Sequence, residues 1–258
     1  MGDPFSDLAE RYNSTGGILR QVVRHKLVDR ALAEHLPPPP SRIADVGGGA
    51  GQQAIPLSRR GYEVTIIDPS PKMLAEARQR LAREEAGVRR RVRLVGGTGE
   101  RAHQTLGGET FDAVLCHGVL MYLEDSRPMI RALSALLRPG GIVSVLAKNA
   151  TALAMRPALE GRYQDALSSL KVERDRGRLG VITRGDTVEN LYERFREAGV
   201  EELRWYGVRV FIDHLGDRMP GEDLPEVLEL EWEVGQRDPY RSVARLIHLV
   251  GRKKPIQG

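Results

Sequence analysis

The segment Asp-Val-Gly-Gly-Gly-Ala-Gly, from Asp45 to Gly51, places three alternating glycines between an apolar run and a helical pattern. A buried strand is expected over 43–46 and a helix from Gln52 onward. Glycines at such a strand-to-helix turn let bare backbone N–H groups and the positive end of a helix approach a ligand. The turn is therefore predicted to bind a cofactor, and a glycine-rich turn without a ligand is the alternative.

The glycine spacing also bears on the cofactor. A dinucleotide-binding Gly-x-Gly-x-x-Gly would need its third glycine at position 52, which is Gln52, so nicotinamide and flavin cofactors are disfavoured. Asp68 ends the next apolar run, about twenty residues after the glycines, where a carboxylate can accept both hydroxyls of a ribose. A helix cap is the alternative role for Asp68. Together the two features predict a cofactor that carries a ribose.

Two further loops are expected at the same edge of the sheet. The loop Gly96-Gly-Thr-Gly-Glu100 can approach an adenine, with Glu100 or a backbone group meeting its exocyclic amine. The next strand ends at His117, which begins the run His117 to Tyr122. A histidine at a strand end can equally be a structural residue with an internal hydrogen-bond partner.

Bulk composition bounds the class of protein. The chain has 258 residues, of which 41% are apolar, and this suits one globular domain. It has no apolar stretch of membrane-spanning length and no secretory pattern at its N-terminus, so a cytoplasmic location is expected. The single cysteine, Cys116, excludes an intrachain disulfide and a cysteine zinc site, and it is expected to be a core residue. A net charge of +4 mildly favours an anionic partner such as nucleic acid.

Apolar runs alternate with helical patterns along most of the chain. This rhythm predicts an α/β fold with a doubly wound, Rossmann-like, mostly parallel seven-stranded sheet and an antiparallel edge. Strands are expected over 43–46, 63–67, 92–95, 112–116, 142–146, 202–211 and 245–250. Helices are expected over 18–36, 52–60, 72–85, 126–137, 186–199 and 224–232, with a turn over 138–141.

The rhythm is interrupted between Lys148 and Gly185, where a helical and loop insertion is predicted to lie over the site. The charged stretch from Lys171 to Arg178 marks it as exposed. We therefore expect one domain over 1–258, with an N-terminal helical cap (1–40), a cofactor-binding core (41–147), the insertion (148–185) and a segment that completes the sheet (186–258).

The sequence resembles the class I S-adenosylmethionine-dependent methyltransferases, through the glycine turn, the acidic end of the second strand and Leu-Arg-Pro-Gly-Gly. Over nearly the whole chain it is similar to the bacterial tRNA 5-carboxymethoxyuridine methyltransferases, which methylate a wobble-uridine carboxymethoxy group to its ester. The segments that carry this closer resemblance are Gly17–Gln21, Asp45–Gln52, Phe111–Leu120, Leu137–Gly141, Asn149–Ala150, Gly207–Phe211, Glu229–Glu231 and Arg245–His248.

The resemblance implies that the cofactor is S-adenosylmethionine, the methyl donor. The residues that it implies around the donor are Arg20, Gly47, Gly48, Asp68, Gly99, Glu100 and His117, and we add Asp45 and Gly49 from the glycine turn. Arg20 is expected to hold the methionine carboxylate of the donor in a bidentate pair. A solvated arginine at the start of a helix is the alternative.

The chain also departs from the tRNA enzymes. They have an aromatic residue and a histidine where this chain has Lys148 and Thr151, and the lysine cluster of their insertion is interrupted here by Glu173 and Asp175.

A sulfonium methyl group is already activated, so the enzyme has mainly to align an acceptor and exclude water. An acceptor carboxylate is anionic at neutral pH and needs no general base, and we assign no catalytic base and no metal. Arg209 and His117 are candidates for positioning the reactants. Candidates for holding the acceptor are Tyr122, Lys148, Asn149, Arg209 and Arg245, with Arg156 as a further arginine. For Arg209 and His248 the alternative is a core partner for an acid such as Asp213 or Glu229.

Three functions remain open from the sequence: methylation of tRNA, methylation of a small metabolite under the insertion as a lid, and donor binding without catalysis. A basic surface continuous with the donor cleft favours the first, and a closed apolar pocket favours the second. The oligomeric state is not predicted.

Overall fold

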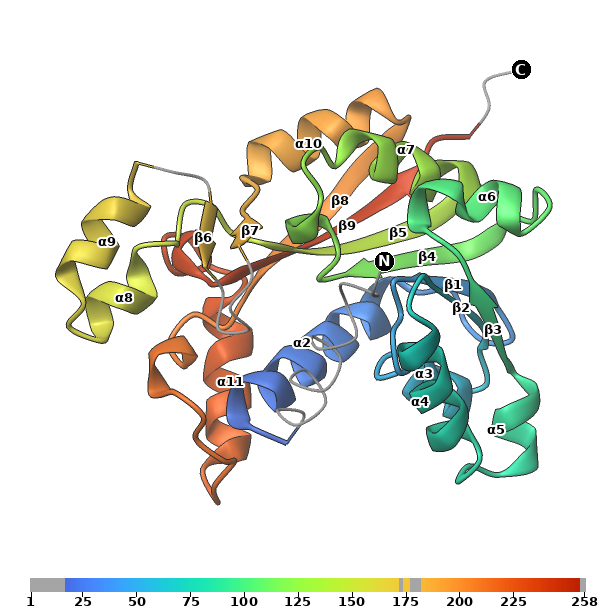
Figure 1. The fold of residues 1–258 in the computed structure, drawn as a ribbon, viewed down its shortest axis with the longest axis horizontal. Coiled ribbons are helices and arrows are strands. Elements are labelled where there is room, and N and C mark those ends of the chain that lie inside the picture. The colour runs from blue at the N-terminus through green and yellow to red at the C-terminus, as the bar shows by residue number, and fades with distance from the viewer. Residues whose placement is uncertain (1–16, 172–173, 177–181, 256–258) are drawn as a thin grey trace.

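The computed structural model describes residues 17–171, 174–176 and 182–255. A seven-stranded sheet in the order β3-β2-β1-β4-β5-β9-β8 forms the centre of the molecule (Figure 1). The strands are β1 (Arg42–Val46), β2 (Glu63–Asp68), β3 (Val92–Gly96), β4 (Phe111–His117), β5 (Leu137–Lys148), β8 (Val200–Val208) and β9 (Leu246–Lys253). Strands β1 to β5 pair in parallel, and β9 is antiparallel to both β5 and β8. The predicted fold class is confirmed.

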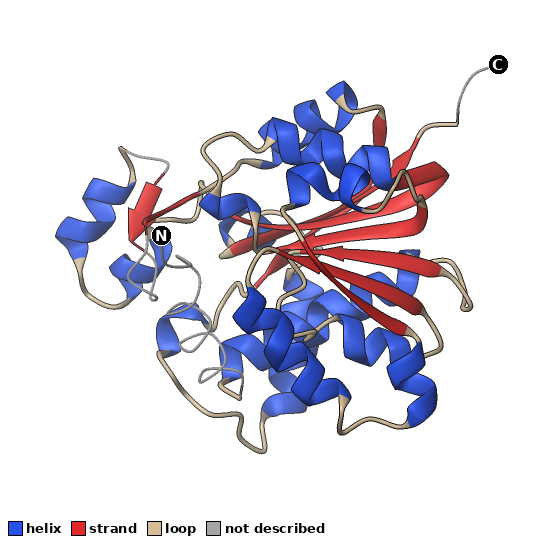
Figure 2. Ribbon diagram, turned by 45° about the vertical axis from the view of Figure 1, so that its right-hand side comes forward, coloured by secondary structure: helices blue, strands red, loops and turns tan. Residues whose placement is uncertain are grey.

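Helices cover both faces of the sheet (Figure 2). One face carries α2 (Leu19–His35), α3 (Ala54–Arg59), α4 (Pro71–Leu81) and α11 (Leu224–Val234), and the other carries α6 (Ala102–Thr105), α7 (Arg127–Leu136) and α10 (Val188–Glu197). Successive strand residues point to opposite faces, so Ile43 joins the core under α2 whereas Ala44 joins the core under α7. The central strands are buried on both sides and are therefore apolar almost throughout.

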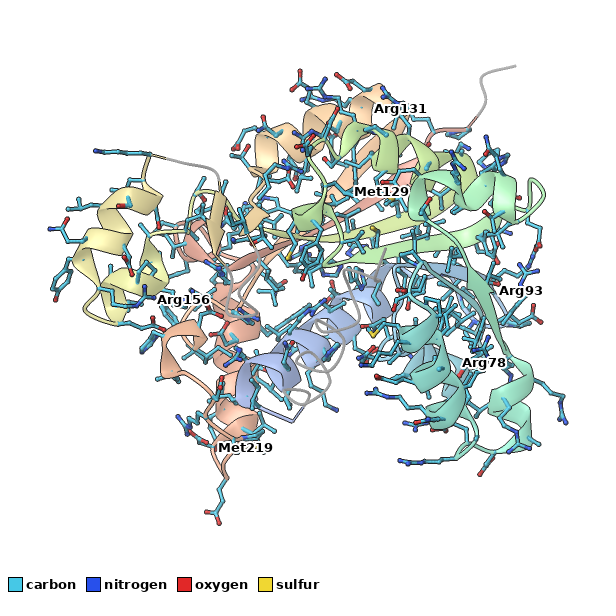
Figure 3. All side chains as sticks on the ribbon, viewed as in Figure 1. Arg78, Arg93, Met129, Arg131, Arg156 and Met219 are labelled. Carbon is cyan, nitrogen blue, oxygen red and sulfur yellow. The ribbon has the colours of Figure 1, made fainter. Side chains whose placement is uncertain are left out.

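Helix α7 shows how sequence pattern decides which side faces the sheet. Met129 is buried against the core, whereas Arg131, two residues further on, points to solvent (Figure 3). Ser126 occupies the cap position before the helix, but its hydroxyl makes no capping hydrogen bond. The hydroxyl instead accepts a hydrogen bond from the Arg194 guanidinium of α10 at 2.7 Å, which ties the two helices together.

Three predicted boundaries are wrong. The helix expected over 72–85 ends at Leu81, a short helix α5 (Ala86–Arg90) follows, and the Glu84 carboxylate between them pairs with Arg59. The turn expected over 138–141 belongs to β5, because buried Leu137 pairs with Phe111 before a register shift. The extended segment expected over 202–211 leaves the sheet after Val208, since Arg209 adopts a left-handed backbone (φ +65°).

The insertion follows the end of β5 and projects from one end of the sheet (Figure 1). It contains α8 (Met155–Leu159), α9 (Tyr163–Ser169) and the two-stranded ribbon of β6 (Arg174–Arg176) and β7 (Ile182–Arg184). Of the charged stretch expected over 171–178, positions 172–173 and 177–178 lie outside the described residues. Asp186 anchors the end of the insertion, because its buried carboxylate pairs with both Arg184 and Arg194.

None of the helices within the described ranges is long and apolar enough to cross a membrane.

Candidate active site

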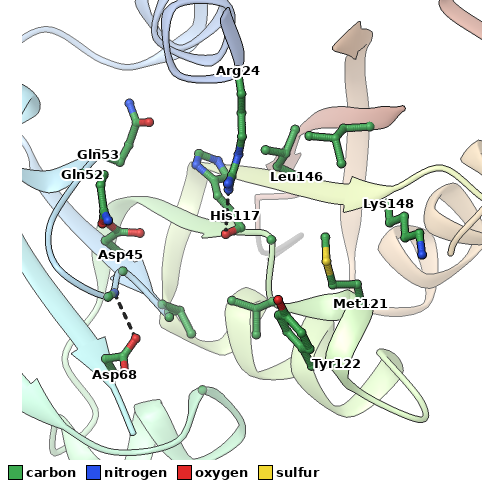
Figure 4. A pocket seen from close by; sticks show the side chains of 18 of the residues that line it. Arg24, Asp45, Gln52, Gln53, Asp68, His117, Met121, Tyr122, Leu146 and Lys148 are labelled. Carbon is green, nitrogen blue, oxygen red and sulfur yellow. Dashed lines mark hydrogen bonds between the residues drawn. The ribbon is translucent and has the colours of Figure 1, made fainter. Parts of the chain in front are cut away.

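A cleft of about 500 Å³ opens at the carboxyl ends of β1, β2, β4 and β5 (Figure 4). It brings together almost every site residue predicted from the sequence. Those that line it are Arg20, Asp45, Gly47, Gly48, Gly49, Asp68, Gly99, Glu100, His117, Tyr122, Lys148, Arg156, Arg209 and Arg245. Asn149 lies just outside, where its amide donates to the carbonyls of Ser242 and Ala244 and thereby holds the chain before β9.

The glycine turn has the backbone that only glycine adopts easily. Gly47, Gly49 and Gly51 all have positive φ angles, of +71°, +54° and +78°. The expectation of bare N–H groups is wrong for these three, because each amide already has an acceptor. Gly47 donates to the Ile67 carbonyl, Gly51 to Gly48, and Gly49 to the Asp68 carboxylate at 2.9 Å. The turn therefore offers close backbone approach, and its own amides serve to rigidify it.

Two carboxylates flank this turn. Asp68 Oδ2 accepts from Gly49, and Oδ1 accepts from the Ser70 amide at 2.9 Å, so the carboxylate is fixed toward the cleft. Asp45 is buried near the end of β1, and its Oδ2 has no hydrogen-bond partner among the residues that the structure describes. Burial, followed by the charge of Asp68, raises the pKa of Asp45 to about 7. A cationic ligand bound here would lie near the Asp68 carboxylate and near Asp45, which can lose its proton and supply a second negative charge.

The loop after β3 forms another wall. Gly99 is buried so closely that a Cβ would lie 2.5 Å from Met129 Cε and 2.7 Å from Val46 Cγ1, while Glu100 remains exposed at the rim. Met73, Met121 and Met129 also line the cleft. These methionines were not predicted from the sequence, because an apolar residue at helical spacing has the pattern of a core residue. Methionine suits a flat aromatic ligand, since its thioether is polarisable and its chain adaptable.

Helix α2 contributes two arginines, one turn apart. Arg20 is buried, and its guanidinium donates to the Gly216 carbonyl at 2.7 Å and pairs with Asp217. Arg24 was missed, although its spacing of four residues from Arg20 places both on one helical face. Its guanidinium donates to the His117 carbonyl at 3.3 Å (Figure 4). Both side chains line the cleft, so this end of it is cationic.

His117 belongs to a buried hydrogen-bonded series. Its Nε2 lies 2.9 Å from Ser144 Oγ, which lies 2.7 Å from Nε2 of His248. Burial lowers the pKa of His117 well below its usual value and that of His248 to about 3, so both rings are neutral near pH 7. His248 therefore has a partner in the core, but that partner is Ser144 and not an acid. Glu229, one of the two acids expected as partners, instead pairs with Arg30 at the surface.

Another part of the cleft wall is a cationic corner formed by Lys148, Arg156, Arg209 and Arg245, and the Asp213 carboxylate pairs with Arg209 and lies beside Arg245. The sheet register assembles it, because Lys148 at the end of β5 and Val208 at the end of β8 both pair with Leu246 of β9. Arg209 directly follows Val208, and Arg245 directly precedes Leu246. Burial lowers the pKa of Lys148 to about 7, with the charge of Arg245 as the next cause.

The left-handed backbone of Arg209 is held from outside the corner. Both carboxylate oxygens of buried Glu231 accept backbone amides at 2.7 Å, one from Val210 and one from Phe211. A positive φ at a residue other than glycine costs about 1–3 kcal/mol and persists only where its surroundings hold it. The Glu231 clamp therefore explains why Arg209 turns into the cleft instead of continuing β8.

No group of three or more His, Cys, Asp or Glu side chains suited to a metal occurs within the described part of the chain.

Comparison with known proteins gives consistent matches. A methyltransferase domain family matches residues 44–143. The tRNA 5-carboxymethoxyuridine methyltransferase of Escherichia coli O157:H7 is 34% identical over 256 residues, covering 96% of this chain and 95% of the relative. A ubiquinone biosynthesis O-methyltransferase of Methylocella silvestris is 36% identical, but over only 46% of this chain and 44% of its own length.

Solved structures share the fold. A magnesium protoporphyrin IX methyltransferase from Synechocystis, solved with bound S-adenosylhomocysteine, has a TM-score of 0.64 at 17% identity and covers 96% of this chain and 95% of its own. A possible histamine N-methyltransferase from Thermotoga maritima has a TM-score of 0.63 at 19% identity and covers 97% and 98%. The chain belongs to the class I S-adenosylmethionine-dependent methyltransferases, in the same family as the E. coli tRNA 5-carboxymethoxyuridine methyltransferase.

Proposed function

We propose that the enzyme transfers the methyl group of S-adenosylmethionine to the carboxylate of 5-carboxymethoxyuridine at the wobble position of tRNA. The observation that carries this proposal is the cationic corner, where four basic side chains meet beside the donor cleft. It is supported by the 34% identity to the E. coli tRNA enzyme over 96% of the chain.

The residues present fit the donor. Asp68 lines the cleft and is fixed there by two backbone amides, and a carboxylate in this place suits the ribose hydroxyls. Asp45 Oδ2 is a buried oxygen with no hydrogen-bond partner in the described part of the chain, and it can balance the positive charge that the donor brings. Arg20 and Arg24 suit the methionine carboxylate, and the methionines near Gly99 suit the adenine. S-adenosylmethionine supplies an electrophilic methyl group, and the protein residues bind it, orient it and exclude water.

The corner suits an anionic acceptor. Lys148, Arg156, Arg209 and Arg245 line this wall of the cleft, and an anionic acceptor would accept stronger, charge-assisted hydrogen bonds from them than a neutral alcohol would. A carboxylate is also already a nucleophile, so no general base has to take a proton. Two histidines, His25 and His117, line the cleft, and burial lowers the pKa of both, that of His25 to about 3, so both rings are neutral near pH 7. Nε2 of His117 already faces Ser144.

A small anionic metabolite is the second candidate acceptor. Lys148 Nζ donates to Thr183 Oγ1 of β7 at 2.7 Å, so the insertion forms part of the cleft wall, as a lid over a small molecule would. The partial match to ubiquinone O-methyltransferases covers too little of the chain to favour their acceptor.

Analysis of modified nucleosides distinguishes the two. In tRNA from cells that lack this protein, we expect 5-carboxymethoxyuridine to accumulate and its methyl ester to disappear, and the protein supplied from a plasmid should restore the ester. Unchanged tRNA nucleosides in both strains would exclude the tRNA proposal and leave the metabolite.

A further inference from the structure

Asp213 lies against two arginines of the cationic corner, Arg209 and Arg245. Its Oδ1 pairs with the Arg209 guanidinium, and its Oδ2 lies 3.8 Å from Nε of Arg245. All three side chains are at most 11% exposed, so water screens these charges weakly. Glu160 also lies close to the corner, at 3.9 Å from Nε of Arg156, and is less buried, at 23% exposure.

In the proposed reaction, the rate depends on how tightly this corner binds the acceptor carboxylate. A carboxylate oxygen of the acceptor forms the new O–CH3 bond while the S–CH3 bond breaks, with its electron pair going to sulfur. An anion and a sulfonium cation thus become a neutral ester and a neutral thioether, and no proton moves. The acceptor loses negative charge in the transition state, so cations that hold it stabilise the ground state more than the transition state.

We propose that Asp213 weakens the corner to a strength that binds an acceptor carboxylate without suppressing its nucleophilicity. Asp213 is a positioning residue in this scheme, because it acts through Arg209 and Arg245. Its carboxylate accepts a hydrogen bond from Nη2 of Arg209 and lies beside Nε of Arg245. Neither guanidinium can therefore direct its full set of donors at the acceptor. This proposal rests on the proposed carboxylate acceptor, and it adds that Asp213 limits how tightly the acceptor binds.

Asp213→Asn tests the proposal, because it removes one negative charge at nearly constant shape. For methylation of hypomodified tRNA, KM and kcat should both fall, each by roughly tenfold, which corresponds to about 1.4 kcal/mol of altered charge interaction. If Asp213 served only to hold the arginines in place, KM would rise while kcat fell. That result would overturn the proposal.

Acetate provides a readout that needs no tRNA. An NMR titration of acetate against the enzyme saturated with S-adenosylhomocysteine should show roughly tenfold tighter binding to Asp213→Asn than to the wild type. Asp213→Glu keeps the charge and should bind acetate as the wild type does. Asp223→Asn is the matched control, because it removes an acid from an exposed ion pair with Arg218, and it should change nothing.

The two proposals fail in different ways. Acetate affinity that is equal in the wild type and Asp213→Asn would refute the role of Asp213, whatever the enzyme methylates. Absence of methyl transfer to tRNA by the wild type would refute the proposed acceptor and leave the acetate result standing. Should Asp213→Asn fail to fold, as judged by circular dichroism, Asp213→Ser makes the same change of charge, and the same acetate criterion applies to it.

Discussion

The carboxylate of Asp68 accepts the backbone N–H of Gly49 at 2.9 Å, so the acidic end of β2 and the glycine turn after β1 form one hydrogen-bonded unit. Ser70 completes the unit by donating its amide to the other carboxylate oxygen. The two sequence features that first indicated a ribose-bearing cofactor are thus joined by a hydrogen bond. Disturbing either should alter donor binding.

Gly49→Val should abolish donor binding and leave the protein folded. At φ +54° a Cβ would be strained and would lie 2.7 Å from Met73 Cε, which itself lines the cleft. Circular dichroism and calorimetric titration with S-adenosylhomocysteine separate folding from binding. Gly107→Val is the matched control, because Gly107 has a similar φ of +62° and nothing within 4 Å. Normal binding by Gly49→Val would mean that the turn is only structural.

Asp68→Ala should weaken donor binding by about 1–3 kcal/mol, because the ribose hydroxyls lose their charged acceptor. Calorimetric titration with S-adenosylmethionine and with its demethylated product measures the loss, which should be the same for both ligands. Asp29→Ala, which removes an exposed partner of Arg60, should bind normally. Binding of a nicotinamide dinucleotide by the wild type would refute the assignment of the cleft.

Donor affinity should fall as the pH drops below about 7. The pKa of Asp45 is raised to about 7, mainly by burial, so the folded protein without donor takes up a proton there that the unfolded chain takes up only near its usual value of 3.8. This group therefore makes the fold less stable as the pH rises from about 4 to 7. A cationic donor favours the charged form, so its binding near pH 7 should release a proton.

Calorimetry in two buffers of different ionisation enthalpy detects that proton. Asp45→Asn should bind the donor with no proton release and with a flatter pH dependence between 6 and 8. Equal proton release from the wild type and Asp45→Asn would show that another group titrates.

Arg20→Ala should weaken S-adenosylmethionine and its product alike, by about 1–3 kcal/mol, and spare a decarboxylated analogue. The reason is the loss of a buried guanidinium partner for the ligand carboxylate. Lys26→Ala, an exposed change on the same helix, serves as the control and should bind all three ligands normally. Equal losses for the three ligands with Arg20→Ala would indicate damage to α2 and its contact with Asp217.

The parts of the site that depend on local pattern could be predicted from the sequence. The glycine turn, Asp68 and the loop ending at Glu100 each follow a strand, and carboxyl ends of parallel strands meet at one edge of the sheet. The helices α10 and α11 were also predicted to within two residues at each end, because helix starts and stops are local signals.

The parts of the site that depend on long-range strand pairing could not be predicted from the sequence. The pairing of Arg209 with Asp213, four residues on, was the predicted alternative for Arg209, but Arg245 joins this pair only because β9 inserts between β5 and β8, and periodicity does not reveal the order of strands. The hydrogen bonds from His117 through Ser144 to His248 cross three strands in the same way. The left-handed Arg209 was missed as well, since it depends on Glu231 of another element.

The most direct test of the central claim is transfer of a labelled methyl group from S-adenosylmethionine to hypomodified tRNA by the purified enzyme. We predict label in 5-carboxymethoxyuridine methyl ester, and tRNA binding that weakens by orders of magnitude from low to moderate salt as phosphate contacts release counter-ions. Label that appears in a small carboxylate or hydroxyl compound, with none in tRNA, would contradict the account.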